Sequence, residues 1–344
     1  MTRNIISKEV ENMATTVISS FNEFLKNSVN LDPKVVSEAR KSRDNLLNNI
    51  STFSDNEGFF TLWKDINCHF GSFARKTKCR ELDDIDLMIG ISANGATYNQ
   101  FSEWNNVKIF SSKDDEAQNQ CSNTDGTLNS TKVINLFKKK LKNLNDYSRS
   151  ELHKNGEAIV LNLVSKSWSF DIVPCFLTKT ELDGRSYYLI PNGAGAWKKT
   201  DPIKDREYVI KTNQNNNGRV LELIRLAKKW NTVKNVKTMP SYMIETMVIN
   251  FANSAYTLSD YIDINICNLF KYIADNIINP VNDMKEIQGN INTLDIFDKI
   301  AVKDKATSDY EKACHAIKLE QTDNKKLAIK EWGEIFGSDF PEFG

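Results

Sequence analysis

Two aspartates separated by one residue are the first feature of this sequence that could do chemistry. Asp84 and Asp86 lie in the alternating polar and apolar run 84–89, which is typical of a strand with one buried face. Successive side chains of a strand point to opposite faces, so the two carboxylates should project together. Carboxylates this close repel each other, and a divalent cation such as Mg²⁺ would make both useful as ligands.

A third carboxylate and a Gly-Ser step complete this set of residues. Gly71 permits close approach of the backbone, and Ser72 offers a hydroxyl and an amide that could hold phosphates. Asp171 lies in the apolar run 168–174, which we expect to form a strand that Pro174 ends or places at an edge. The run 157–164 is the expected partner strand. An acid inside such a strand is costly unless it binds something.

These residues together predict a metal and phosphate site. A Gly-Ser turn or an Asp-x-Asp strand edge alone is more often structural than functional, but their order, with the later acid Asp171, is far more specific. We expect Asp84, Asp86 and Asp171 to be catalytic residues that hold two Mg²⁺ ions, for which Mn²⁺ could substitute.

With these motifs the chain resembles the cGAS/DncV-like nucleotidyltransferases of the polymerase-beta-like superfamily, the bacterial relatives of cyclic GMP-AMP synthase and oligoadenylate synthase. The resemblance rests on the stretches 71–86, 170–174, 188–202 and 224–242. It implies an α+β fold in which a polymerase-beta-like nucleotidyltransferase lobe with an N-terminal helical spine precedes a C-terminal helical lobe. The nucleotide cleft would lie between the lobes.

The resemblance also implies roles for residues outside the three acids. Lys228 and Ser241 would contact the donor triphosphate, together with Gly71 and Ser72, and Tyr242 would stack on a base. The adjacent Lys229 could replace Lys228. Without the resemblance, both lysines would be read as a solvated helix face and Tyr242 as a core residue.

One position departs from the pattern of the family. Bacterial members commonly have a glycine after the Ala-Arg of the first motif, whereas this chain has Lys76. We therefore expect the backbone of this loop, or its contact with phosphate, to differ from that of other members.

The activity that the resemblance implies is synthesis of a cyclic di- or trinucleotide second messenger from nucleoside triphosphates, ATP, GTP or both, with release of pyrophosphate. The biological setting would be antiphage signalling in the bacterial cytoplasm. Two alternatives stay open at this point. One is a nucleotidyltransferase that modifies RNA, a small molecule or a protein. The other is a nucleotide-sensing module that binds nucleotides without catalysing a reaction.

The charge, hydropathy and cysteine content of the chain limit the binding partners that we expect. The chain has 344 residues, with 45 basic and 45 acidic side chains, so its net charge gives no footprint for holding long nucleic acid. The basic helix expected over 131–145 is interpreted as a solvated face. Neither a signal peptide nor a segment of membrane-spanning length is found, which predicts a cytoplasmic protein with no membrane partner. The six scattered cysteines and three histidines form no zinc pattern, so reduced structural thiols are expected.

The apolar spacing divides the chain into parts. We expect a catalytic lobe over 1–212, with a helical spine that is interrupted near Asp32-Pro33, and a polar surface loop over 111–130. The asparagine-rich stretch 213–218 would link it to a helical lobe over 213–335, and residues 336–344 would form a flexible tail. Within the second lobe, helices are expected over 220–230, 242–256, 259–278, 293–303, 308–319 and 326–335.

The last residue carries a separate hypothesis. In many bacterial antiviral operons, enzymes of the family that the chain resembles are joined to targets through their C-terminus by an E1/E2-like conjugating protein. Gly344 would suit such acyl transfer because nothing hinders its carboxyl carbon, and an ordinary frayed terminus is the alternative.

Overall fold

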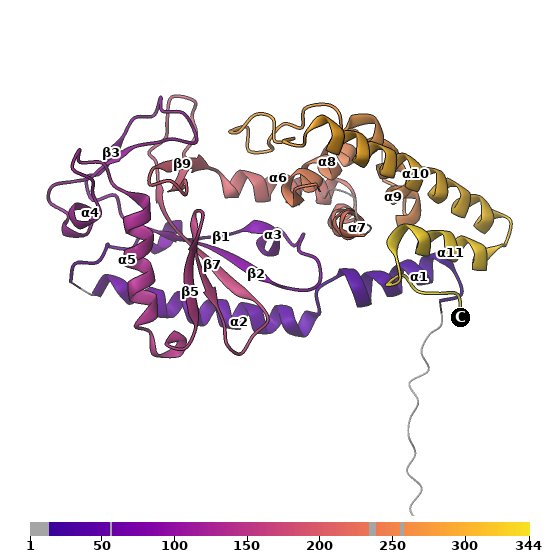
Figure 1. The fold of residues 1–344 in the computed structure, drawn as a ribbon, viewed down its shortest axis with the longest axis horizontal. Helices are drawn as coiled ribbons and strands as arrows, with labels where there is room; N and C mark the ends of the chain where they lie inside the picture. The colour runs from indigo at the N-terminus through magenta and orange to yellow at the C-terminus, as the bar shows by residue number, and fades with distance from the viewer. Residues whose placement is uncertain (1–13, 56, 234–238, 255–257) are drawn as a thin grey trace, which may run out of the picture. The chain divides into compact units, whose positions relative to one another are not determined.

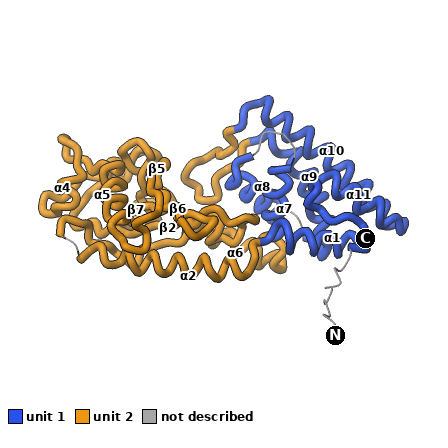
Figure 2. The backbone as a smooth tube through the Cα atoms, turned by 60° about the horizontal axis from the view of Figure 1, so that its bottom comes forward, with its two compact units in different colours: residues 1–30, 222–279, 294–344 blue, residues 31–221, 280–293 orange. Residues whose placement is uncertain are grey.

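The computed structural model describes residues 14–344 except 56, 234–238 and 255–257. The chain folds as two compact units (Figure 1). Unit 1 comprises residues 1–30, 222–279 and 294–344, and unit 2 comprises residues 31–221 and 280–293 (Figure 2). These bounds differ from the predicted ones, because the first helix groups with the C-terminal helices and the segment 280–293 groups with the sheet.

The sheet of unit 2 carries the predicted acids. Its described residues form seven strands in the order β1-β2-β7-β6-β5, with β8 pairing with β7 and β9 with β8. Strands β2 and β7 are parallel, and the other neighbours are antiparallel. The bounds are β1 Cys68–Phe70, β2 Asp84–Gly90, β5 Glu151–Asn155, β6 Ala158–Asn162, β7 Ser169–Leu177, β8 Tyr188–Pro191 and β9 Trp197–Thr200. A separate pair joins β3 Thr97–Tyr98 to β4 Ile109–Phe110.

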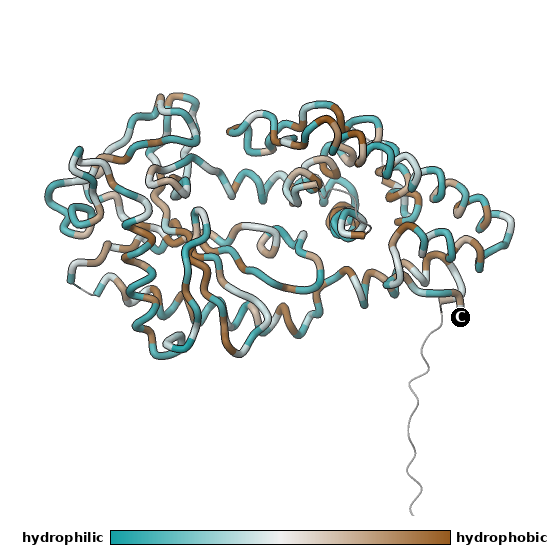
Figure 3. The backbone as a smooth tube through the Cα atoms, in the orientation of Figure 1, coloured by the Kyte–Doolittle hydropathy of each residue, from teal (hydrophilic) through white to brown (hydrophobic). Residues whose placement is uncertain are grey.

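The alternation of the central strands decides which face of the sheet is covered by helices. Ile85, Leu87 and Ile172 are buried in one apolar cluster together with residues of α2 (Pro33–Ile50) and α5 (Ser130–Lys142). Met88 and Val173, which point the other way, belong to a second cluster. Figure 1 shows α2 and α5 beside the sheet, and Figure 3 shows hydrophobic residues along its central strands.

Pro174 does not end its strand as predicted. It lies inside β7, opposite Ile89 of β2. On the other side of β7, pairing with β6 ends at Ile172 and pairing with β8 begins at Phe176. A proline lacks the N–H that a ladder needs, and Pro174 occupies the gap where β7 changes partners. The strand therefore continues through it.

Other parts of unit 2 were predicted less completely. The polar stretch 111–130 is not wholly a loop, because it contains α4 (Glu116–Gln120). Helix α6 (Pro202–Asn215) was not predicted; Asp201 caps it by accepting from the Lys204 backbone N–H, and Pro202 occupies its first turn. The remaining short helices are α3 Gly71–Ala74, η2 Phe53–Asp55, η3 Lys64–Ile66 and η4 Asn145–Tyr147.

Unit 1 is helical in its described residues. Its helices are α1 Val17–Phe24, η1 Leu25–Val29, α7 Val220–Thr232, α8 Ser241–Ser254, α9 Ile262–Asn276, α10 Ile296–Gln321 and α11 Lys325–Phe336. Helix α10 replaces the two helices expected over 293–303 and 308–319. No helix in the described ranges is long and apolar enough to cross a membrane.

The segment after α11 is packed rather than free, contrary to the predicted flexible tail. Phe340 is 3% exposed, and its ring lies 5.1 Å from that of Phe21 and 5.2 Å from that of Phe24. Phe343 forms a parallel bridge with Ala14. Burial of an aromatic ring against two others holds this segment to α1.

Candidate active site

The pairing of β2 with β7 brings the three predicted acids to one face of the sheet. Asp86 lies directly opposite Asp171, and Asp84 lies opposite Ser169. Met88 and Val173, which share this face with them, pack in the same cluster. The predictions that Asp84 and Asp86 project together from a strand, and that Asp171 lies on a neighbouring strand, are confirmed.

The pKa values of Asp86 and Asp171 are raised, because the carboxylates are buried and close to one another. Burial and, to a smaller extent, the charges of Asp84 and Asp171 together raise the pKa of Asp86 from 3.8 to about 7. Burial and the charge of Asp84 likewise raise the pKa of Asp171 to about 6. The folded chain therefore holds negative charge at a place where it is costly, and a bound cation would offset that cost.

A lysine that the sequence did not single out lies at this cluster. The Lys78 ammonium donates to Asp84 Oδ1 at 2.7 Å and also pairs with Asp83. Burial lowers the pKa of Lys78, but its hydrogen bonds to the two aspartates outweigh this and raise it. Because Lys78 precedes the strand in an irregular loop, no periodicity in the sequence could have placed it beside Asp84.

The Gly-Ser step forms a turn directly against the acids. Gly71 has φ +71°, and a Cβ added to it would lie 1.7 Å from Asp86 Oδ2. The Ser72 carbonyl accepts from the backbone N–H groups of Thr77 and Lys78 at 2.9 and 3.2 Å. These bonds return the chain toward β2, so that the turn and the carboxylates share one small volume.

Lys76 takes the backbone shape that its glycine counterpart would take. Its φ is +62°, in the left-handed region that L residues other than glycine rarely adopt. The turn therefore has a backbone conformation that glycine favours, and the expected difference from other members in loop shape or phosphate contact stays a prediction. The cost is local strain of about 1 kcal/mol.

We expect Lys76→Gly to be tolerated. The substitution removes strain of about 1 kcal/mol and adds a similar entropy to the unfolded chain, so the free energy of unfolding should change by less than about 1 kcal/mol. Thermal denaturation measures this directly. Lys76→Val, which places a β-branched residue at the same φ, should lower the melting temperature clearly, and equal melting temperatures for the two variants would contradict the argument.

A buried ion pair fastens this turn to α6. The Arg75 guanidinium donates to Asp205 Oδ2 at 2.8 Å, and the two side chains are 10% and 5% exposed. Loss of one partner from such a pair leaves an uncompensated buried charge, so removal of either Arg75 or Asp205 should destabilise the turn. Neither residue was predicted, because the helix that carries Asp205 was not.

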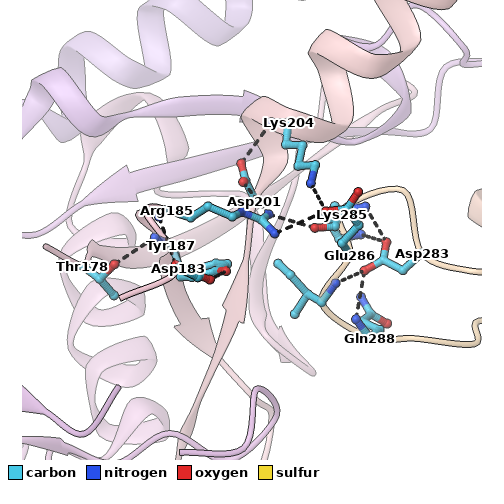
Figure 4. Close-up of polar contacts among 11 residues, drawn as sticks. Thr178, Asp183, Arg185, Tyr187, Asp201, Lys204, Asp283, Lys285, Glu286 and Gln288 are labelled. Carbon is cyan, nitrogen blue, oxygen red and sulfur yellow. Dashed lines mark hydrogen bonds and ion pairs between the residues drawn. The ribbon is translucent and has the colours of Figure 1, made fainter. Parts of the chain in front are cut away.

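The beginning of α6 is itself held by the segment 280–293. Arg185 donates to Asp201 Oδ2 at 3.0 Å and to the Lys285 carbonyl at 2.8 Å, and Lys204 pairs with Glu286. Figure 4 shows these contacts converging on the segment. Residues far apart in the chain thus support the helix that anchors the Gly71 turn.

The expected nucleotide contacts other than Gly71 and Ser72 lie in unit 1. Lys228 is 8% exposed and pairs with Glu245, so it is not the solvated lysine that the helix pattern alone suggested. Lys229 pairs with Asp339 at 2.7 Å. Ser241 is the exposed first residue of α8, and Tyr242, half-buried, follows it. Their roles toward a nucleotide stay predictions.

Two further predictions concern sites away from the acids. Gly344 is exposed, and its conjugation stays a prediction. All six cysteines are free thiols, in agreement with the expected reduced state. In the part of the chain that the structure describes, no three His, Cys, Asp or Glu side chains, Asp84, Asp86 and Asp171 included, are arranged as the ligands of a metal ion, so binding of Mg²⁺ by the three aspartates stays a prediction.

The raised pKa of Asp86 predicts a pH-dependent stability of the chain without divalent cations. The Asp86 carboxyl loses its proton near pH 3.8 in the unfolded chain and near pH 7 in the folded chain. The folded state binds more protons between these values, so its stability falls as pH rises from about 4 to about 7. The full penalty is about 4 kcal/mol at most.

Asp86→Asn should remove this penalty. In EDTA, the variant is expected to melt at a higher temperature than the wild type at pH 8, and at nearly the same temperature at pH 4.5, where Asp86 is protonated in the folded wild type. Differential scanning calorimetry at the two pH values measures the difference. If the melting temperature of the variant rose by the same amount at pH 8 and at pH 4.5, the charge of Asp86 would not be the cause of the rise.

Comparisons with known proteins agree with this site. No family model matches the sequence. A probable cyclic nucleotide synthase of Bacillus cereus (strain VD146) is 39% identical over 332 residues, covering 96% of this chain and 99% of that protein. The cyclic AMP-AMP-AMP synthase of an Acinetobacter species is 26% identical over 217 residues, covering 58% of this chain and 57% of that protein.

Two solved structures share the fold. E. coli MS115-1 CdnC with ATP has a TM-score of 0.68 at 16% identity and covers 94% of this chain and 98% of that chain. Vibrio cholerae DncV, a cyclic AMP-GMP synthase, has a TM-score of 0.58 at 14% identity and covers 80% of this chain and 69% of that chain.

Fold, acids and relatives define a nucleotidyltransferase enzyme. The chain belongs to the cGAS/DncV-like nucleotidyltransferases, and the predicted resemblance and α+β fold class are confirmed.

Proposed function

We propose that the chain joins nucleoside triphosphates, ATP, GTP or both, into a cyclic di- or trinucleotide and releases pyrophosphate. The observation that carries the proposal is the set of Asp84, Asp86 and Asp171 on one face of the sheet against the Gly71 turn. It is supported by the identity of 39% to a probable cyclic nucleotide synthase over nearly the whole of both chains.

The chemistry of the three carboxylates suits Mg²⁺, which prefers hard oxygen ligands and leaves positions open for phosphates and water. Asp84, Asp86 and Asp171 would hold it, and a bound cation would relieve the burial and mutual repulsion that raise the pKa values of Asp86 and Asp171 despite the nearby Lys78. Bound there, Mg²⁺ would stabilise the charge of the triphosphate and lower the pKa of a ribose hydroxyl.

The residues of the chain would then position the two reacting nucleotides. A ribose hydroxyl oxygen of the acceptor attacks the donor α-phosphorus, the bond to the β-phosphate oxygen breaks, and pyrophosphate leaves. Asp171 would help to hold the Mg²⁺ that lowers the pKa of the attacking hydroxyl, and the proton of that hydroxyl would pass to solvent. Ser72 would bind the donor phosphates from the turn, and Lys228, Ser241 and Tyr242 would contribute from unit 1. A second transfer closes the ring.

A structural neighbour suggests the kind of protein partner that this chain would bind. A structure of E. coli MS115-1 CdnC in complex with HORMA-deltaN shares the fold at a TM-score of 0.66, which supports a regulatory protein partner for this chain. An antiphage role and conjugation through Gly344 by an E1/E2-like protein belong to the same proposal.

The fate of labelled nucleotide tests the proposal against its alternatives. The protein is incubated with α-³²P-labelled triphosphates and Mg²⁺, and label is followed in small products and in macromolecules. A small labelled product with release of pyrophosphate is expected. Label in RNA or protein would favour a modifying transferase, and nucleotide binding without pyrophosphate release would favour a sensing module.

A further inference from the structure

A small cavity of unit 2 lies beside the turn that follows α3. It encloses about 120 Å³ and is lined by residues of α2, of β1, of the turn after α3 and of α6. Its basic lining residues are Arg40, Arg43, His69, Lys76 and Arg206. Asp86 belongs both to this lining and to the acid cluster, whereas Ser72, Asp84 and Asp171 do not line the cavity, so it adjoins the proposed metal site without coinciding with it.

Two of these cations are not neutralised within the described part of the chain. Arg43 donates to Asp44 Oδ1 at 2.7 and 2.9 Å. The guanidinium groups of Arg40, exposed, and Arg206, half-buried, form no hydrogen bond or ion pair with any described residue. Asp86 is the one acid among the lining residues. A half-buried guanidinium without a partner is costly, and an anion would relieve that cost.

His69 lies where burial and nearby arginine charges both disfavour its protonated form. Burial is the main cause that lowers the pKa of His69; the charge of Arg43 lowers it further, Asp44 opposes this, and Arg206 adds a smaller lowering effect. Charges from α2 and from α6 therefore act on the same imidazole. These two helices come from distant parts of the sequence, so their cations converge only in the folded chain.

The size and the donors of the cavity define the ligand. A volume of about 120 Å³ is well below the roughly 300 Å³ at which sites for drug-sized ligands begin, so it suits a small anion and not a nucleoside. Guanidinium groups match phosphate oxygens in geometry and bind them with charge-assisted hydrogen bonds. We propose that this cavity is a binding site for a phosphoryl group, supplied by free phosphate or by a pyrophosphate or nucleotide.

Such a site would connect three parts of the fold. Lys76 belongs to the turn that begins at Gly71, Arg40 belongs to α2, and Arg206 belongs to α6. A phosphoryl group bound among them would hold the catalytic turn to both helices. The inference rests on these cations and not on the proposed catalysis, so failure of one leaves the other standing.

Histidine NMR tests the site directly, because the chain has three histidines. The full chain is titrated with inorganic phosphate in EDTA, so that phosphate cannot bind through a metal at the acids. The His69 signals are expected to shift and saturate, while those of His315, exposed on α10, should not. Equal, unsaturated shifts of both residues would show only general ionic effects and overturn the proposal.

A matched pair of variants locates the binding. Arg40→Gln/Arg206→Gln should weaken phosphate binding by about tenfold or more, because it removes two charge-assisted contacts. Lys34→Gln/Lys41→Gln makes the same change of charge at two exposed positions of α2 and should bind as the wild type does. Equal affinity of both variants would contradict the proposal. If Arg206→Gln does not fold, the exposed Arg40→Gln alone gives the same comparison.

Titration with pyrophosphate and with ATP, again in EDTA, separates the sources of the phosphoryl group. Tighter binding of pyrophosphate or ATP than of phosphate, with the same dependence on Arg40 and Arg206, would assign the site to a product or nucleotide. Binding of phosphate alone would assign it to the free ion.

Discussion

Asp86→Asn and Asp171→Asn are each expected to reduce nucleotide transfer by at least about a thousandfold while the chain stays folded. Asp86 and Asp171 lie opposite each other on parallel strands, and both carboxylates have raised pKa values because burial and neighbouring charge disfavour ionisation. Asparagine keeps the shape of each side chain but cannot supply the negative oxygen that a hard cation needs. Turnover measured as pyrophosphate release reports the loss.

A matched control separates charge at the site from charge in general. Asp65→Asn makes the same substitution at an exposed position of η3, in the same unit, and should keep full activity. Circular dichroism and thermal denaturation should show all three variants folded. If Asp86→Asn or Asp171→Asn retained activity near that of Asp65→Asn, the assignment of these carboxylates would be wrong.

Gly71→Ala is the second substitution from which we expect a large effect. The new Cβ would lie 1.7 Å from Oδ2 and 2.4 Å from Cγ of Asp86, and φ of +71° is itself strained for alanine. Either the turn or Asp86 must move. We expect destabilisation of about 2 to 4 kcal/mol, and loss of activity of at least about a hundredfold, because misplacement by an ångström is enough for that.

Gly156→Ala is the control for backbone strain. Gly156 has φ +53°, and a Cβ added there meets nothing within 4 Å, so only the strain of about 1 kcal/mol should appear. The excess loss of stability in Gly71→Ala then measures the collision with Asp86. That excess should shrink when Asp86→Ala is added, and simple additivity of the two changes would argue against the close contact.

The sequence was sufficient to locate the strands of the site. Alternation placed Asp84 and Asp86 on one face of β2, and the apolar run around Asp171 predicted β7, because a half-buried strand constrains every second residue. Helices α7, α8, α9 and α11 followed from their apolar spacing, with bounds within a few residues.

Contacts between distant segments could not be predicted in the same way. Arg75 and Lys78 reach Asp205 and Asp84 from the irregular segment between α3 and β2, so neither contact leaves a period in the sequence. Lys228 looked solvated, but Glu245, a helix away, stabilises it in the interior. The unit bounds depended on the segment 280–293, whose polar contacts with Arg185 and Lys204 belong to the sheet unit.

The central claim is that Asp84, Asp86 and Asp171 serve the synthesis of a cyclic oligonucleotide. The most direct measurement is mass spectrometry of a phosphatase-treated reaction containing the purified chain, the four nucleoside triphosphates and Mg²⁺, beside the Asp84→Asn/Asp86→Asn variant. A phosphatase-resistant product with the mass of two or three nucleoside monophosphates joined in a ring, absent from the variant, is the predicted result. A product that appears equally with the variant, or only linear and phosphatase-sensitive products, would contradict the claim.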